Sequence, residues 1–368
     1  MKILLIANHL NVGGIASYLL ILGSSLKHRG HQVYLACGGG ELEEKFLAAG
    51  IKLLRVPLRT KQEISPQILV SFLKLKRMAG KLEIDVIHSH SRTTQVLGCL
   101  LARALNKPHV FTCHGFFKPR LLRRLCGCWG KMVIAISQQV QEHLINDFKL
   151  AASRIQVVHN GIDLERFKDC SGREQARAEF GGRQIILIGI IARLSDVKGH
   201  IHLIRALPAV AKQFPSLKLL IVGQGKTQRF LEEAVVSLGL AGQATFIPQV
   251  RDTRDLLCAL DIFVMPSLQE GLGLALMEAM AQGLAVVGSR VGGIKTLIQH
   301  NLNGLLVEPA DTQGLAAALI SLAADPDLRR RLGQEARKFI AANFSAQKMA
   351  EQTEFVYRQV LQEKTKGG

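Results

Sequence analysis

The sequence has 368 residues, of which 48% are hydrophobic, and it carries a formal net charge of +18 with a mean hydropathy of +0.18. This length suits two domains, and this composition excludes an intrinsically disordered chain. No run of about 18 apolar residues occurs, so a membrane span is not expected. Met1–Ala7 is too short for the apolar core of a signal peptide and is better explained as a first buried strand.

Strand-like and helix-like patterns alternate along the whole chain. The first series of short β-branched runs comprises Ile3–Ala7, Gln32–Ala36, Ile51–Val56, Val86–His88, His109–Thr112, Met132–Ile136 and Ile155–Val158. After a polar stretch from Asp169 to Arg183, a second series comprises Ile185–Ile190, Leu217–Val222, Ala244–Pro248, Ile262–Met265, Ala285–Gly288 and Gly304–Val307. The pattern predicts two Rossmann-like domains with parallel, doubly wound sheets, and the crevice between them is the expected ligand site.

The seven cysteines are odd in number and irregular in spacing. They argue against a disulfide framework and for a reducing compartment. Cys126-Gly-Cys128 is the only close pair, and it lacks the second pair or the histidines of a zinc site. We therefore expect these two cysteines to pack rather than to bind metal.

Residues 267–289 form the most informative segment of the chain. A loop follows the strand Ile262–Met265, and a helix is predicted to begin near Leu272–Leu274 and to end at Gly283. The N-terminus of such a helix favours phosphate or sugar oxygens. Glu270 precedes the helix and Glu278 lies about two turns inside it, and a carboxylate can accept hydrogen bonds from both hydroxyls of a sugar diol.

This segment, SLQEGLGLALMEAMAQG, resembles the signature S-x-x-E-G-[FL]-G-L-x-x-x-E-A-M-A-x-G of glycosyltransferase family 4 and matches it at every fixed position. Members of that family are retaining nucleotide-sugar transferases of GT-B fold. The resemblance extends over nearly the whole chain. It implies an acceptor-side domain of residues 1–168 joined by a C-terminal helix over 345–368, and a donor-binding domain of residues 169–344.

The resemblance also implies roles for residues of the second domain. Glu278 would bind the ribose diol and Glu270 the sugar hydroxyls, while Gly271, Leu272 and Gly273 belong to the donor-binding loop. The element Ala192-Arg-Leu-Ser-Asp-Val-Lys-Gly199 resembles the family's G-R-L-x-x-x-K-G. Arg193 and Lys198 would then neutralise the leaving nucleoside diphosphate, so no cofactor and no divalent metal are expected. Lys295-Thr296 stands where relatives usually carry Pro-Glu, which leaves the base and sugar preference open.

In the first domain, Gly13 and Gly14 open a helix after the first strand, where small residues let a backbone approach a diphosphate. Phe111-Thr-Cys-His-Gly115 resembles the family's T-x-H-G. By that resemblance His114 lies close to the transferred sugar and takes a catalytic role with Glu270. The match is looser in this domain, which holds the acceptor in the family.

Positive charge is concentrated in the first half of the chain: residues 1–168 have 24 Lys and Arg against 10 Asp and Glu. Two stretches, Ser65–Leu82 and Lys118–Lys131, combine cations with apolar side chains, a composition that suits an acidic membrane surface. The residues concerned are Ile68, Leu69, Phe72, Leu73, Lys74, Lys76, Arg77, Met78 and Lys81 in the first, and Arg120, Arg123, Arg124 and Trp129 in the second. A core-facing helix with a solvated basic face is the alternative. Nucleic acid is not expected, because no nucleic-acid-binding module is recognisable.

The sequence thus predicts a retaining, metal-independent glycosyltransferase, cytoplasmic and peripheral on the cytoplasmic face of the inner membrane. It would move a sugar from a nucleoside-diphosphate sugar to a hydroxyl of an envelope glycan or glycolipid, such as lipopolysaccharide core or another anionic acceptor. Two alternatives remain open. One is a GT-B enzyme of another reaction, such as a nucleotide-sugar epimerase or a phosphorylase; the other is a non-catalytic sugar-nucleotide-binding protein.

Overall fold

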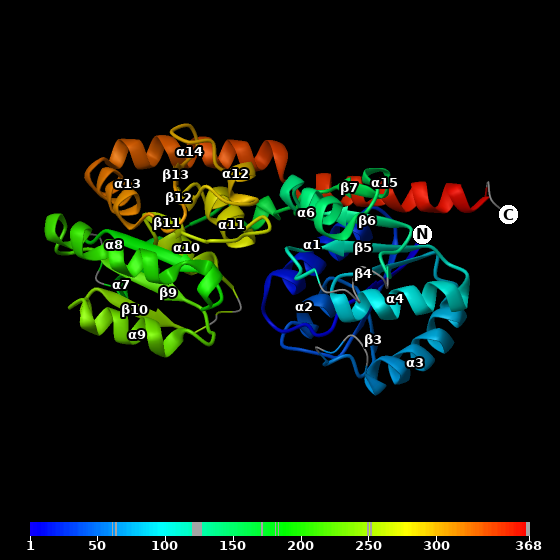
Figure 1. Ribbon diagram of the computed structural model, residues 1–368. Coiled ribbons are helices and arrows are strands. Elements are labelled where there is room, and N and C mark those ends of the chain that lie inside the picture. Colours follow the sequence, from blue (N-terminus) through cyan, green and yellow to red (C-terminus); the bar gives the residue numbers. More distant parts are fainter. Residues whose placement is uncertain are drawn as a thin grey trace. The chain divides into compact units, whose positions relative to one another are not determined.

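The structure is a computed structural model that describes residues 1–60, 62, 65–119, 127–170, 172–180, 182, 184–248, 250 and 252–365 (Figure 1). The chain divides into two compact units. The first unit contains Met1–Gly161 and Ala346–Gly368, and the second unit contains Ile162–Ser345. The chain therefore leaves the first unit once, completes the second, and returns for its last helix.

The first unit is built on a seven-stranded parallel sheet with the strand order β3-β2-β1-β4-β5-β6-β7. Its strands are β1 (Lys2–Ile6), β2 (Gln32–Cys37), β3 (Lys52–Arg55), β4 (Val86–Ser89), β5 (His109–Cys113), β6 (Met132–Ala135) and β7 (Ile155–Val157). Because every strand is parallel to its neighbours, the side chains that follow the strands gather at one edge of the sheet.

Helices cover both faces of this sheet. Alternate residues of β1 enter opposite cores: Ile3 and Leu5 pack with α1 (Gly14–His28) and α15 (Ala346–Thr365), whereas Leu4 and Ile6 pack with α3 (Pro66–Leu82) and α4 (Arg92–Leu105). The unit also contains α2 (Glu43–Ala48) and α6 (Gln138–Phe148). Because β1 is buried on both faces of the sheet, its sequence from Ile3 to Ile6 is a continuous apolar run.

The C-terminal helix α15 is an integral part of the first unit. Val356, Tyr357 and Val360 are completely buried, and Glu354 accepts hydrogen bonds from Arg29 at the end of α1 (2.7 Å) and from Arg358. Burial alone would raise the pKa of Glu354, but its contacts with Arg358, Arg29 and His31 outweigh burial and lower that pKa to about 2. Apolar packing and this charged contact together hold α15 on α1.

The second unit contains a six-stranded parallel sheet of order β10-β9-β8-β11-β12-β13. The strands are β8 (Leu187–Ile191), β9 (Lys218–Val222), β10 (Ala244–Ile247), β11 (Ile262–Met265), β12 (Ala285–Ser289) and β13 (Leu305–Val307). The helices are α7 (Arg173–Ala178), α8 (His200–Gln213), α9 (Gln228–Ser237), α10 (Arg254–Ala259), α11 (Leu274–Gln282), α12 (Ile294–Leu297), α13 (Thr312–Ala324) and α14 (Pro326–Asn343). Each strand of the first predicted series is present in the first sheet, and each strand of the second series is present in the second sheet.

The borders between the units differ slightly from the expected 168/169 and 344/345. The structure divides the chain after Gly161 and after Ser345. Ile162 donates its backbone N–H to the carbonyl of Phe344 (2.8 Å), and Phe167, in the short helix η2 (Leu164–Phe167), is buried. These contacts attach residues 162–167 to the second unit.

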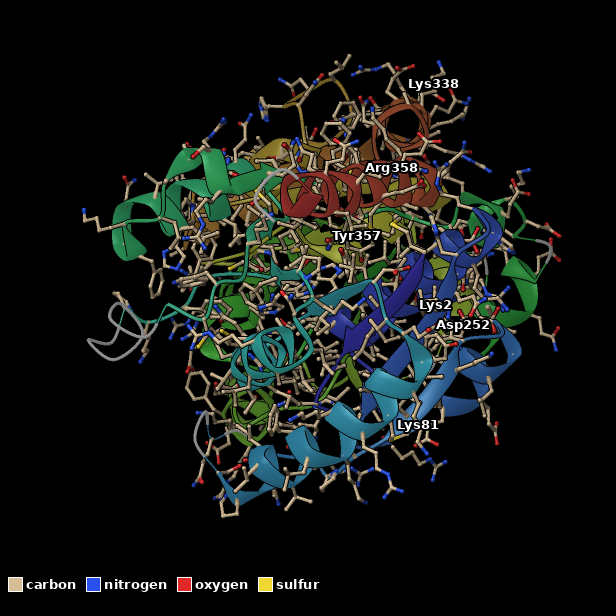
Figure 2. All side chains as sticks on the ribbon, turned by 90° about the vertical axis from the view of Figure 1, so that its right-hand side faces the viewer. Lys2, Lys81, Asp252, Lys338, Tyr357 and Arg358 are labelled. Carbon is tan, nitrogen blue, oxygen red and sulfur yellow. A yellow bond between two sulfur atoms is a disulfide. The ribbon has the colours of Figure 1, made fainter. Side chains whose placement is uncertain are left out.

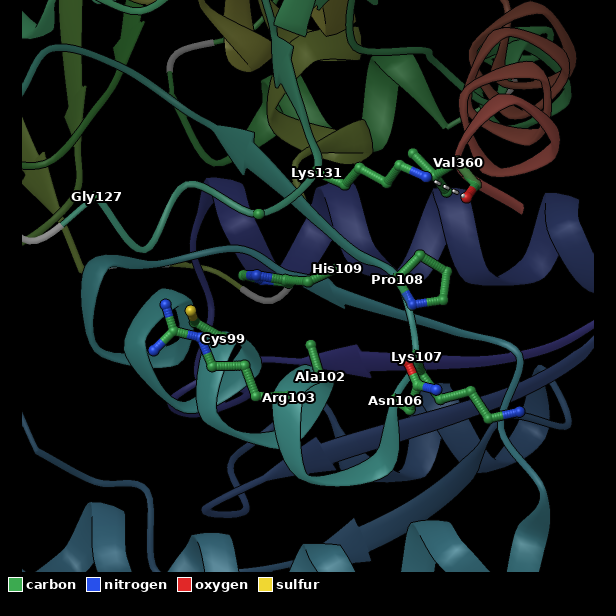
Figure 3. A pocket seen from close by; sticks show the side chains of 11 residues that line it. Cys99, Ala102, Arg103, Asn106, Lys107, Pro108, His109, Gly127, Lys131 and Val360 are labelled. Atoms are coloured by element: carbon green, nitrogen blue, oxygen red, sulfur yellow. Dashed lines mark hydrogen bonds between the residues drawn. The ribbon is translucent and has the colours of Figure 1, made fainter. Parts of the chain in front are cut away.

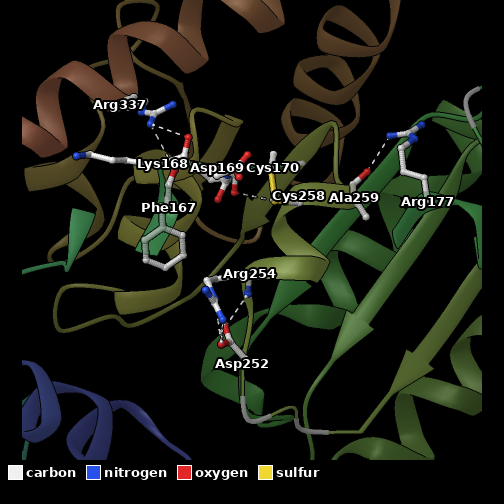
Figure 4. Close-up of a disulfide and its surroundings, with 11 residues drawn as sticks. Phe167, Lys168, Asp169, Cys170, Arg177, Asp252, Arg254, Cys258, Ala259 and Arg337 are labelled. Atoms are coloured by element: carbon white, nitrogen blue, oxygen red, sulfur yellow. Dashed lines mark hydrogen bonds and ion pairs between the residues drawn. A yellow bond between two sulfur atoms is a disulfide. The ribbon is translucent and has the colours of Figure 1, made fainter. Parts of the chain in front are cut away.

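A disulfide joins Cys170 to Cys258 within the second unit (Figure 4). The number and spacing of the cysteines argue against a disulfide framework, and this single bond was not expected from them. The two cysteines are 88 residues apart, so no local spacing signals their contact, but folding brings their Cα atoms to 5.5 Å. The bond ties α10 to the segment that follows η2. Cys126 of the predicted packing pair lies outside the described residues, and Cys128 is half-buried.

The two basic stretches have different structures. On α3, Ile68 and Leu75 are buried, whereas Leu69 and Leu73 are each 60% exposed. The cations Lys74, Lys76, Arg77 and Lys81 are exposed on the same helix, with Lys81 at the surface in Figure 2. Trp129, expected beside the second cluster as an apolar anchor, is only 3% exposed and packs on Phe111 and Phe148, so that expectation is wrong. Arg120, Arg123 and Arg124 lie outside the described residues.

Candidate functional site

The loop between β11 and α11 in the second unit carries Glu270. This carboxylate forms an ion pair with Lys198, whose Nζ lies 2.6 Å from Oε2, and it also accepts the backbone N–H of Gly271 at 3.1 Å. Only 11% of the Glu270 side chain and 21% of the Lys198 side chain are exposed. Leu272 is buried, and Gly273 caps α11 with a left-handed backbone (φ 89°). The predicted start and end of this helix are confirmed.

Lys198 is the last residue of the short helix η3 (Asp196–Lys198), which follows β8. The backbone N–H of Leu268 donates to the carbonyl of Val197 (2.8 Å), so the Lys198 turn is attached directly to the Glu270 loop. Arg193, at the beginning of the same connection, is exposed, and its guanidinium forms no ion pair with another described residue. The structure therefore brings Lys198 and Glu270 together and leaves Arg193 open to solvent.

Two glycines allow this close packing of loops. Gly199 has φ 69°, and a Cβ there would lie 1.8 Å from the carbonyl oxygen of Pro266 at the end of β11. Gly292 has φ 42°, and a Cβ there would lie 2.0 Å from the carbonyl oxygen of Glu270. Any larger residue at either position would push the loop that carries Lys198 or Glu270 out of place.

Glu278 lies in the second turn of α11 and is only 8% exposed. Burial raises the pKa of Glu278, whereas the Thr253 hydroxyl, which donates to Oε2 at 2.9 Å, and the nearby Arg166 lower it. Arg166 in turn pairs with Asp252 at 3.2 Å. Thr253 and Arg166 were not identified from the sequence, because neither belongs to a recognisable motif; only the fold brings them to Glu278.

In the first unit, His114 follows β5 and belongs to a cluster of aromatic and imidazole rings. Its Nε2 lies 3.3 Å from Nδ1 of His90, and the ring of Tyr18, from α1, meets it edge-on with centroids 4.6 Å apart. The ring of His88 lies 4.1 Å from that of His90. His88 and His90 were missed from the sequence, although the His-x-His pattern at the end of a predicted strand was a usable signal.

Gly13 and Gly14 stand at the start of α1, as expected. Gly13 is the residue before the helix, and its backbone (φ 158°, ψ 165°) is one that side-chain-bearing residues rarely adopt. No atom lies within 4 Å of a Cβ built on either glycine, so the space beside this turn is open. His114, Gly13 and Gly14 belong to the first unit, and the other predicted site residues belong to the second.

A separate pocket of about 420 Å³ lies in the first unit (Figure 3). Its lining includes Cys99, Arg103, Lys107, His109 and Lys131. His109 is the first residue of β5, whereas His114 follows the last one. The pocket is therefore at the opposite edge of the sheet from His114 and is not part of the predicted site.

For the part of the chain that the structure describes, the sequence predicts no metal site and no membrane span. No three His, Cys, Asp or Glu side chains of that part of the chain are grouped as a metal site would require. None of its helices is both long enough and apolar enough to cross a bilayer.

Comparison with known proteins identifies the family. Residues 12–166 match the family described as Glycosyltransferase Family 4, and residues 173–339 match the one described as Glycosyl transferases group 1. N-acetyl-alpha-D-glucosaminyl L-malate synthase of Bacillus anthracis is 28% identical, with 97% of each chain covered. The UDP-Gal:alpha-D-GlcNAc-diphosphoundecaprenol alpha-1,3-galactosyltransferase of Escherichia coli is 26% identical, with 78% of each chain covered.

Among solved structures, that of Anabaena HepE in complex with UDP and glucose matches with a TM-score of 0.87 at 23% identity, covering 98% of this chain and 100% of the other. This similarity, together with the two parallel sheets, establishes the GT-B fold. The chain belongs to glycosyltransferase family 4 and is a glycosyltransferase.

Proposed function

We propose that this enzyme transfers a sugar from a nucleoside-diphosphate sugar to a hydroxyl of an envelope glycan or glycolipid, with retention of anomeric configuration and without a divalent metal. The observation that carries the proposal is the partly buried Lys198–Glu270 ion pair at the N-terminus of α11. A cation, a carboxylate and free helix N–H groups at one place match a ligand that combines a diphosphate with sugar hydroxyls.

Each side chain has a definite task in this reaction. Lys198, assisted by Arg193, stabilises the negative charge that develops on the leaving diphosphate, and fixed charges of this kind are effective because they need no reorganisation. Glu270 accepts hydrogen bonds from the sugar hydroxyls, and Glu278 accepts them from the ribose diol. In a front-face mechanism the departing phosphate oxygen takes the acceptor proton, so no separate base is required. His114 and Glu270 position the sugar and stabilise the positive charge that develops on it.

The relatives support this assignment of donor and acceptor. The structure of Anabaena HepE holds UDP and glucose, and the Escherichia coli relative is named for a UDP-sugar donor and a lipid-linked diphosphate acceptor. An envelope acceptor such as lipopolysaccharide core or a related anionic glycolipid fits the positive charge of residues 1–168, which have 24 Lys and Arg against 10 Asp and Glu.

The decisive experiment is a thermal-shift screen of nucleotide sugars, followed by transfer to candidate acceptors. The anomeric configuration of the product is then read by NMR, and the rate is measured in EDTA. We expect one nucleotide sugar to stabilise the protein, a retained product, and full activity in EDTA. An inverted product or a strict need for added metal would refute the mechanism. Conversion of the donor to its epimer without an acceptor would instead identify an epimerase.

We further propose that α3 docks on an acidic membrane surface, on the cytoplasmic face of the inner membrane. Leu69 and Leu73 lie one turn apart on this helix and are each 60% exposed, whereas Ile68 and Leu75 on its other face are buried. The exposed cations of α3 follow them in the sequence. Each Lys or Arg at an anionic surface contributes about 1 kcal/mol, so four cations and two leucines suffice for reversible binding.

Sedimentation with vesicles tests this surface. Reversal of Lys74, Lys76, Arg77 and Lys81 to Glu should abolish binding to phosphatidylglycerol vesicles and leave nucleotide binding in the second unit unchanged. The matched control reverses four exposed cations of the second unit, Arg205, Lys212, Arg330 and Lys338, and should still bind. If the unaltered protein ignores acidic vesicles at low salt, the membrane proposal is wrong.

A further inference from the structure

The histidine cluster of the first unit contains a contact whose hydrogen can be assigned. His90, which follows β4, is 1% exposed, and its Nδ1 lies 3.3 Å from Nε2 of His114. Burial lowers the pKa of both imidazoles, so both rings are neutral at physiological pH. A neutral imidazole has one N–H and one bare nitrogen, so one ring donates to the other.

Two arrangements of the hydrogens satisfy this contact, and they differ at the far side of His90. Nε2 of His90 is buried and has no hydrogen-bond partner among the described residues. If His114 donates, this Nε2 carries a hydrogen that has no acceptor. If His90 donates, the same Nε2 is a bare lone pair. Orphaned N–H groups are rarer in protein interiors than acceptors with an unused lone pair, so donation by His90 is favoured.

The surroundings keep both rings in this position. The ring of His88 lies 4.1 Å from that of His90, and both nitrogens of His88 are engaged, Nδ1 with the hydroxyl of Tyr357 (2.6 Å) and Nε2 with that of Thr112 (2.7 Å). Tyr18 packs edge-on against His114. Figure 2 shows Tyr357 on α15, so the C-terminal helix takes part in this arrangement.

We propose that His90 is a positioning residue that donates its Nδ1–H to Nε2 of His114 and so fixes His114 as the Nδ1–H tautomer. Nδ1 of His114 has no partner among the described residues, and its N–H is then a hydrogen-bond donor for a hydroxyl oxygen of the transferred sugar. This use of the tautomer rests on the proposed function, but the tautomer itself is a property of the protein without substrate.

The test is NMR of the ring nitrogens in 15N-histidine-labelled protein without ligand, with the His114 signals assigned by their loss in His114→Gln. We expect His114 to be protonated at Nδ1 in the unaltered protein and in Tyr18→Phe, the matched control from the same cluster. His90→Phe should return His114 to a mixture of tautomers. His90→Asn, whose side-chain amide N–H can replace the Nδ1–H, should keep the Nδ1–H form.

The kinetic expectation is a fall in kcat/KM of about 2- to 10-fold in His90→Phe, with recovery in His90→Asn, the loss expected for one neutral hydrogen bond. Protonation of His114 at Nε2 in the unaltered protein would overturn the proposal, and so would an unchanged tautomer in His90→Phe. If the Phe variant does not fold, the spectra of the unaltered and Asn proteins decide. Absence of sugar transfer alongside the Nδ1–H tautomer would refute the proposed function and leave the tautomer assignment standing.

Discussion

Charged contacts hold Lys198, Glu270 and Glu278 in the second unit, whereas neutral contacts hold His114 in the first unit. In the second unit Lys198 forms an ion pair with Glu270. Thr253 donates a hydrogen bond to Glu278, and the positive charge of Arg166 lies near the same carboxylate. In the first unit His114 is surrounded by uncharged rings and hydroxyls. The difference fits the proposed donor, which has a charged diphosphate and an uncharged sugar. It also predicts that charge-removing substitutions act most strongly in the second unit.

The largest expected effect follows from removal of Lys198. The loss of a hydrogen bond to a charged group costs about 1.5–3 kcal/mol, so Lys198→Ala should weaken nucleoside-diphosphate binding by about 10- to 150-fold. Calorimetry with the nucleoside diphosphate found in the screen measures this. Lys212→Ala, at an exposed position near the end of α8, is the control and should bind normally. Unchanged affinity in Lys198→Ala would show that this cation does not contact the diphosphate.

A smaller effect is expected in the first unit, where Glu354 provides a charged contact outside the histidine cluster. Its lowered pKa of about 2 means that its stabilising contribution is fully present above the ordinary carboxyl pKa of 4.5 and is lost as the pH falls towards 2. Glu354→Gln should therefore destabilise the first unit by about 1–3 kcal/mol at pH 7. The difference from the unaltered protein should shrink in acid.

Trp129 makes this measurement selective, because it is the only tryptophan in the chain and is buried in the first unit. Its fluorescence during denaturant unfolding therefore reports that unit alone. Glu335→Gln, which removes an ion pair with Lys338 in the second unit, is the control and should leave the Trp129 transition unchanged. A Glu354→Gln protein as stable as the unaltered one at pH 7 would contradict the assignment.

The smallest effect concerns Thr253, which supports Glu278 by one hydrogen bond. Thr253→Val keeps the shape of the side chain and removes the hydroxyl, so nucleoside-diphosphate affinity should fall by about 2- to 10-fold. The loss should be smaller for the 2′-deoxy analogue, because Glu278 then has one hydroxyl fewer to bind. Thr245→Val, on the exposed edge strand β10, should bind like the unaltered protein. If Thr253→Val lowered the affinity for both nucleotides equally, Thr253 would have no part in recognising the ribose.

The loop and helix that carry Glu270 and Glu278 could be predicted because their signals are local. Glu270, Gly273 and Glu278 lie within nine residues of one another, and the glycines of this short segment mark where the helix begins and ends. The strands were predictable for the same reason, because each buried run is short and β-branched.

Contacts between segments that are distant in the sequence could not be predicted. Thr253 meets Glu278, Cys170 meets Cys258 and His90 meets His114 only after the sheets have formed. The prediction for Trp129 was wrong because the composition of its segment is the same whether the tryptophan is exposed beside the cations or packed against Phe111. No periodicity distinguishes those two cases.

The position of α15 has a consequence for how the protein is made. Residues 346–365 supply part of the apolar core of the first unit, yet they are synthesised after the whole of the second unit. The first unit therefore cannot complete its apolar core while the ribosome is still translating residues 162–345. Domains usually fold in the order in which they are made. Here the second unit is able to finish first, and part of the apolar core of the nascent first unit stays uncovered until the last helix is made.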